Sequence, residues 1–154
     1  MPYSITQSCV GCQACKKTCP VTAIHGERKE VHAIDDSLCI DCGACGRVCP
    51  HGAVLDRHGN PCAMVKRAQW KKPRISVDKC MSCTICIETC PVNCLSLSPA
   101  MHLKNPHGYP YLHDDKACIG CGFCALECPV EAISMITPQA AHSAGQSDGA
   151  GPDV

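Results

Sequence analysis

The chain has 154 residues and 18 cysteines, but only one Trp, three Tyr and one Phe. So few aromatic side chains cannot fill a large apolar core, and small folds with this much cysteine are typically held by metals or cross-links. Its 14 basic and 14 acidic residues balance, which gives no support to a nucleic-acid-binding role. No apolar run approaches the roughly 20 residues of a membrane span.

Residues 1–58 are expected to form a first α+β module of short strands and short helical turns. The strand signals are short apolar runs bounded by Gly, Pro or charged residues. The expected strands are 3–5, Val21–His25, Val31–Ile34 and Gly52–Asp56.

Residues 59–73 form a basic connector. Asn60 followed by Pro61 fits an N-cap and first helical position, so we expect a short helix over 61–71 that Pro73 stops. The segment also carries four basic residues and Trp70. It is interpreted either as a packed spacer or as a docking element for an acidic partner, with Trp70 as the interface anchor.

Residues 74–136 repeat the plan of the first module, with a longer connection at Pro99–Gly108. The expected strands are Arg74–Asp78, Cys94–Ser98, Tyr109–His113 and Glu131–Ile136. Residues 137–154 are rich in Gly, Ala, Ser and Pro and lack an apolar period, which predicts a disordered tail.

One phrase, Cys-x-x-Cys-x-x-Cys-x-x-x-Cys-Pro, occurs four times, and the copies are called motifs one to four. This spacing matches the bacterial [4Fe–4S] run. The copies are CVGCQACKKTCP (9–20), CIDCGACGRVCP (39–50), CMSCTICIETCP (80–91) and CIGCGFCALECP (118–129).

Zinc and disulfides are the alternatives to iron–sulfur clusters. A zinc site would use two C-x-x-C pairs across a longer loop, or added His, whereas each run here supplies three closely spaced thiols. Disulfides need an oxidising compartment, and residues 1–9 show neither the charged nor the apolar region of a signal peptide. The pattern therefore favours clusters, a cytoplasmic location and anaerobic metabolism.

Two cysteines lie outside the motifs. Cys94 occupies the position of Ala23, Ala53 and Ala132 in the other repeats, which predicts a small buried residue beside a cluster. Cys62, on the connector, is also expected to be packed. His51 follows a motif proline and is interpreted as a plain surface residue, with contact to the surroundings of a cluster as the alternative.

The four motifs and the stretch Cys19–Pro50 resemble tandem bacterial 2[4Fe–4S] ferredoxin modules over residues 1–136. This resemblance implies four [4Fe–4S] clusters, bound crosswise by neighbouring motifs. The implied iron ligands are Cys9, Cys12, Cys15 and Cys49; Cys39, Cys42, Cys45 and Cys19; Cys80, Cys83, Cys86 and Cys128; and Cys118, Cys121, Cys124 and Cys90. A nested pairing of the first motif with the last is the alternative.

By size and module plan, the chain is similar to the non-catalytic electron-transfer subunits of tungsten or molybdenum aldehyde oxidoreductases and benzoyl-CoA reductases. The resemblance implies a wire between a large catalytic oxidoreductase subunit and a redox partner such as a flavin- or NAD-linked subunit. A free-standing polyferredoxin carrier, or a subunit of a hydrogenase or formate dehydrogenase complex, is the alternative. Head-to-tail self-association of the wire into filaments is a further expectation.

Overall fold

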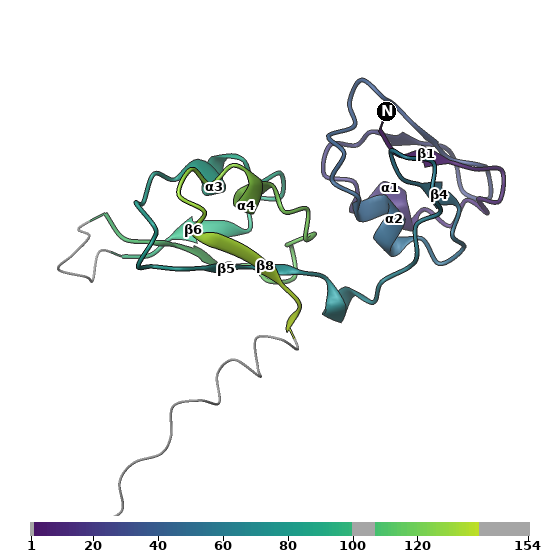
Figure 1. Ribbon diagram of the computed structural model, residues 1–154. Helices are drawn as coiled ribbons and strands as arrows, with labels where there is room; N and C mark the ends of the chain where they lie inside the picture. Colours follow the sequence, from purple (N-terminus) through teal and green to yellow (C-terminus); the bar gives the residue numbers. More distant parts are fainter. Residues whose placement is uncertain (1, 100–106, 139–154) are drawn as a thin grey trace, which may run out of the picture.

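The computed structural model describes residues 2–99 and 107–138 and divides them into two small α+β modules (Figure 1). Each module has two two-stranded antiparallel sheets and two very short helices. Both contain the expected cysteine motifs, so the predicted fold class is confirmed.

In the first module the first strand pairs with the last. Strand β1 (Ser4–Ile5) pairs with β4 (Val54–Leu55), and β2 (Ile24–His25) pairs with β3 (Ala33–Ile34). All four strands fall within or overlap the expected ranges and are shorter than expected.

The second module repeats this pairing. Strand β5 (Lys72–Ile75) pairs with β8 (Ile133–Ile136), and the expected middle hairpin forms from β6 (Leu95–Leu97) and β7 (Pro110–Leu112). Most of the connection at 99–108 and of the tail at 137–154 lies outside the described residues.

Each motif continues into one helical turn that contains its third cysteine. The helices are α1 (Ala14–Thr18), α2 (Ala44–Val48), α3 (Ile85–Glu88) and α4 (Phe123–Leu126). They end early because the next cysteine precedes a proline, which disfavours helical backbone at the residue before it. Cys19 and Cys49 accordingly have extended backbone.

Thiols make up much of the core of both modules. In the first module three buried cysteines pack with Ile24, Ala53 and Val54. In the second, five buried cysteines pack with Leu95 and Ile133. Few large apolar side chains take part, as the composition predicted.

The expected helix at 61–71 is wrong. Only Arg67–Gln69 is helical, as a single 3-10 turn called η1. Before it, Pro61 forms a bridge with Leu55, and the Cys62 backbone N–H donates to the Val54 carbonyl oxygen. The chain after Asn60 is therefore held extended beside β4, and this tertiary pairing overrides the local capping signal.

Pro73 does not stop a helix, because it lies within β5 opposite Met135. The second module therefore starts two residues before the expected boundary at Arg74. A proline is tolerated here since β5 is an edge strand of a two-stranded sheet.

Trp70 is buried between the two modules. Its side chain is only 1% exposed and packs with Ala44 of the first module and Ile119 of the second. The only Trp of the chain thus joins the two modules, so the interpretation of Trp70 as an external anchor is wrong.

Within the described residues, no helix is long and apolar enough to cross a membrane.

Candidate metal centres

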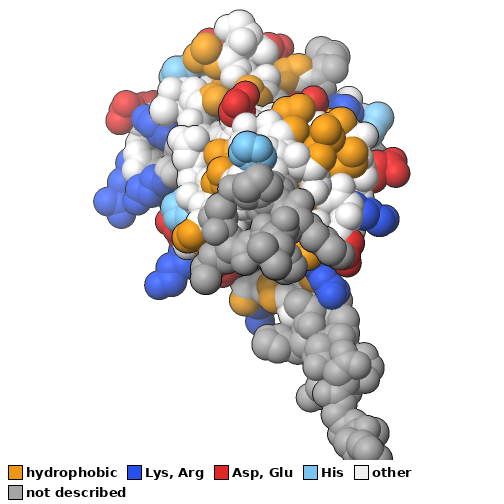
Figure 2. All heavy atoms as spheres, turned by 90° about the vertical axis from the view of Figure 1, so that its left-hand side faces the viewer, with side chains coloured by type: hydrophobic (Ala, Val, Ile, Leu, Met, Phe, Trp, Pro, Cys, Tyr) orange, Lys and Arg blue, Asp and Glu red, His pale blue; other side chains and the backbone are white. Residues whose placement is uncertain are grey.

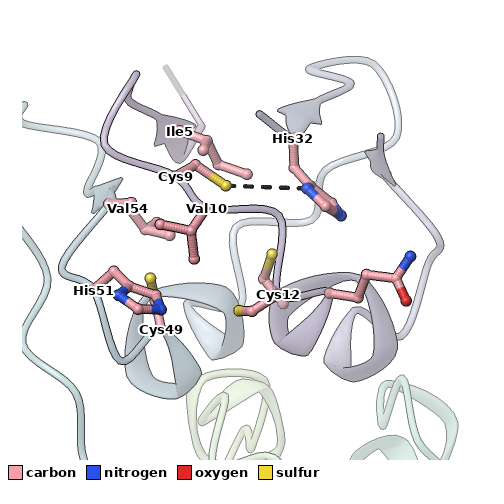
Figure 3. A pocket seen from close by; sticks show the side chains of 11 residues that line it. Ile5, Cys9, Val10, Cys12, His32, Cys49, His51 and Val54 are labelled. Carbon is pink, nitrogen blue, oxygen red and sulfur yellow. Dashed lines mark hydrogen bonds between the residues drawn. The ribbon is translucent and has the colours of Figure 1, made fainter. Parts of the chain in front are cut away.

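Four cavities are each lined by four cysteine side chains of the motifs, and one of them by Cys94 as well. We call them site one (Cys9, Cys12, Cys15, Cys49), site two (Cys19, Cys39, Cys42, Cys45), site three (Cys80, Cys83, Cys86, Cys128) and site four (Cys90, Cys118, Cys121, Cys124). Figure 3 shows site one, where Cys9 and Cys12 face Cys49 across the cavity. All sixteen motif cysteines therefore lie at a site.

Every site takes three thiols from one motif and the fourth from the other motif of the same module. Site one, for example, combines motif one with Cys49 of motif two. The nested alternative would need thiols of motifs one and four side by side. In the structure the last cysteine of each motif lies instead beside its neighbouring motif.

The motif loops share an uncommon backbone conformation. In each one, the residue before the second cysteine and the residue after it have positive φ. The eight residues are Gly11, Gln13, Asp41, Gly43, Ser82, Thr84, Gly120 and Gly122. Five of these eight positions hold Gly or Asp, which adopt left-handed backbone readily. Gln13, Ser82 and Thr84 adopt the left-handed conformation at a cost of about 1–2 kcal/mol each.

This conformation turns backbone N–H groups toward the thiols. Gly11 N–H donates to Cys9 Sγ at 3.5 Å, and Ser82 N–H donates to Cys80 Sγ at 3.4 Å. A second pair of donors follows the motif prolines, with Ala23 N at 3.4 Å from Cys19 Sγ and Ala132 N at 3.3 Å from Cys128 Sγ. Such loops form concavities suited to an anionic group, including iron–sulfur clusters.

The third cysteine of every motif is buried, and burial disfavours the charged thiolate form of its side chain. Desolvation raises the pKa of Cys15 to about 11 and the pKa values of Cys45 and Cys124 to about 12. Metal binding requires deprotonated thiols, and the positive charge of the metal supplies the missing compensation.

The thiols of each site line a cavity and do not converge on the position of a single metal ion. Within residues 2–99 and 107–138, no three His, Cys, Asp or Glu side chains form a group that could hold one metal ion. The donor set, four thiols around an apolar void with N–H donors to sulfur, fits a polynuclear [4Fe–4S] cluster.

His32 is a site residue that the sequence analysis missed. Its side chain is 2% exposed, lines site one and has Nδ1 3.0 Å from the Glu30 carbonyl oxygen and 4.0 Å from Cys9 Sγ (Figure 3). Its Nε2 atom is buried and has no hydrogen-bond partner among the described residues. Alternation within the expected strand Val31–Ile34 could have placed this residue on the inner face.

His51 is exposed, as expected, but it also lines site one, so the alternative of contact with the surroundings of a cluster describes it better than a plain surface residue. Cys62 packs against α2, where a Cβ atom on Gly46 would come within 2.6 Å of Cys62 Sγ. The expectation that Cys62 is packed is therefore confirmed.

Cys94 is buried, as expected, but it is more than a space-filling residue. It lines site four, with Sγ 3.5 Å from Cys90 Sγ. A hydrogen bond from the Cys94 thiol also lowers the pKa of Cys118, while the pKa of Cys94 itself is raised. Site four thus has a thiol donor where the other three repeats have alanine.

Replacing Cys94 with Ala is expected to lower the reduction potential at site four. A donor to ligand sulfur stabilises the extra negative charge of the reduced state, so its loss favours the oxidised state. A hydrogen bond of about 1 kcal/mol corresponds to about 40 mV for one electron. An EPR-monitored redox titration measures the shift, with Cys62→Ala as the control. A potential that stays unchanged, or rises, would contradict the assigned donor.

Comparison with known families agrees with the geometry. Profiles described as a 4Fe–4S dicluster domain match residues 4–55 and 79–132, one in each module. A third profile of the same description matches residues 31–91, which contain motifs two and three. Consecutive motifs share one spacing, so sequence matching alone does not separate the pairs as the structure does.

Among curated proteins, no significant sequence match to this chain is found. Among solved structures, a chain of the "Formate dehydrogenase - heterodisulfide reductase - formylmethanofuran dehydrogenase complex" from Methanospirillum hungatei is similar. The two share 22% sequence identity with a TM-score of 0.39, over 82% of this chain and 51% of that one. This chain thus spans about half the length of the chain that it matches.

Proposed function

Starting from a chain that carries two 4Fe–4S dicluster domains in tandem, we propose that the protein conducts electrons through four [4Fe–4S] clusters and performs no bond chemistry itself. The observation that carries this proposal is the set of four cavities, each lined by four thiols of the motifs. A bound [4Fe–4S] cluster takes up and returns one electron at a time, at potentials between roughly −700 and +450 mV.

The chain's own residues have three tasks in this proposal. The sixteen motif cysteines bind the iron of the four clusters, with the four motif cysteines of each site binding one cluster. Backbone N–H donors such as those of Gly11 and Ser82 stabilise negative charge on the ligand sulfurs. Buried side chains such as Ile24 and Val54 exclude water from the sites.

We propose further that the chain is the electron-transfer subunit of an oxidoreductase complex. Support comes from apolar surface at site three, where the lining residues Met81 and Val130 are 59% and 36% exposed. Figure 2 shows exposed apolar side chains among charged ones on one face of the molecule. A partner that covers the site-three surface would bring its own redox centre close to site three.

Two classes of catalytic partner remain as proposals. One is a tungsten or molybdenum aldehyde oxidoreductase, and the other is a formate dehydrogenase or hydrogenase complex. The complex that contains the similar chain includes a formate dehydrogenase, an enzyme of the second class. Copurification with a large subunit at fixed stoichiometry would support a complex, whereas isolation of the chain alone would support a free-standing carrier.

The cluster proposal is tested by anaerobic purification and analysis of iron and acid-labile sulfide. About 16 of each per chain are expected if every site holds a [4Fe–4S] cluster. Reduction with dithionite should produce EPR signals of reduced clusters. A colourless protein that contains zinc would refute the proposal.

A further inference from the structure

The two modules meet at sites two and four. Cys42 of site two and Cys121 of site four both pack against the cluster formed by Ala44, Trp70 and Ile119. Sites two and four are therefore neighbours across the junction between the modules.

Sites one and three lie away from this junction. The second cysteines of motifs one and three, Cys12 and Cys83, are exposed, whereas the equivalent Cys42 and Cys121 are partly buried. The same position in the repeat thus faces the other module in two motifs and solvent in the other two. The pattern makes sites one and three the two ends of the molecule's series of sites.

One guanidinium group connects the two motif loops at the junction. Arg47 Nη2 donates to the Cys42 carbonyl oxygen at 3.1 Å and to the Ile119 carbonyl oxygen at 2.6 Å. Ile119 directly follows Cys118, a residue of site four. A single nitrogen atom thus joins the loop of site two to the loop of site four.

Trp70 and the connector complete the junction. The Arg47 guanidinium lies 5.4 Å from the centroid of the Trp70 ring, and Trp70 Nε1–H donates to the Val65 carbonyl oxygen at 2.9 Å. At motif four, a Cβ atom on Gly120 would come within 2.8 Å of the Lys71 carbonyl oxygen. The connector therefore lies directly against motif four, which needs glycine at this position.

From this geometry we infer that Arg47 and Trp70 hold site two against site four, so that the electron path runs in the order one, two, four, three. The inference rests on the proposed function. Each transfer along the path moves one electron from a reduced to an oxidised site and makes or breaks no bond. Arg47 and Trp70 act as positioning residues, and the exposed sites one and three are where electrons enter and leave.

The inference is tested with Arg47→Gln in the anaerobically purified full chain. Lys17 occupies the equivalent position of motif one and is exposed, so Lys17→Gln is the matched control. Fully reduced wild type and Lys17→Gln should show the same EPR spin–spin interaction between sites two and four. Arg47→Gln should keep its iron and lose that interaction, with slower electron redistribution between modules after partial reduction.

The outcomes separate the two proposals. Wild-type protein without iron or reducible clusters would refute the proposed function. Full iron in Arg47→Gln with an unchanged spin–spin interaction would overturn only the inferred junction. If Arg47→Gln loses iron, Trp70→Phe and Arg47→Lys are measured in its place. Trp70→Phe removes the hydrogen bond to Val65 and should weaken the spin–spin interaction. Arg47→Lys keeps the positive charge and should retain part of that interaction. An interaction unchanged in both would again overturn the inference.

Discussion

Anaerobic removal of iron is expected to unfold the chain. The buried core of each module consists largely of cysteines that face the sites, with few large apolar side chains to pack in their place. When metal binding and folding are coupled in this way, the free energy of binding is free energy of folding. Far-UV circular dichroism and thermal unfolding should show loss of the cooperative transition after treatment with chelator and acid.

Reconstitution provides the control for this prediction. Iron and sulfide together should restore both the colour and the cooperative transition, whereas reductant alone should not. A metal-depleted chain that retains native circular dichroism and unfolds cooperatively would show that the apolar packing is sufficient. It would then contradict the view that clusters form the core.

Replacing Cys49 with Ala is expected to remove the cluster from site one, although Cys49 belongs to motif two. The structure places its thiol in the cavity with Cys9, Cys12 and Cys15. Alanine leaves that site with three of the four thiols that a [4Fe–4S] cluster needs, so iron should fall from about 16 to about 12 per chain. Iron analysis and EPR of the reduced protein measure the loss.

Two further variants identify which site is lost. Under crosswise binding, the EPR spectrum of Cys49→Ala should match that of Cys12→Ala, because both residues line site one. It should differ from that of Cys42→Ala, which alters site two. Cys62→Ala, outside all four sets, should keep full iron. A match between Cys49→Ala and Cys42→Ala would show that each motif binds its own cluster.

The expected modules and most of the expected strands come from local signals that the tertiary structure leaves unchanged. The hairpin of β6 and β7 forms where the apolar runs around Cys94–Ser98 and Tyr109–His113 predict it. The short helices around each third cysteine form where expected, and the Pro after each motif limits them to one turn. These features depend on neighbours within a few residues.

Other features depend on residues far away along the chain, and there the sequence analysis was wrong or silent. Asn60 and Pro61 carry a helix-start signal, but pairing of Pro61 with Leu55 keeps the segment extended. Trp70 in a basic segment resembles a surface anchor, yet it is buried between Ala44 and Ile119. The sequence analysis gave His32 no role, although its ring lines site one.

Sixteen thiols at a fourfold repeated spacing are sufficient to indicate the cluster type and the two-module α+β fold, because metal-ligand spacing is a property of short loops. The position of one module against the other required the folded chain. It depends on Arg47 meeting Ile119, 72 residues away, and on Trp70 filling the space between the modules. Contacts of this kind bring together surfaces that are distant along the chain, and no local pattern specifies which surfaces will meet.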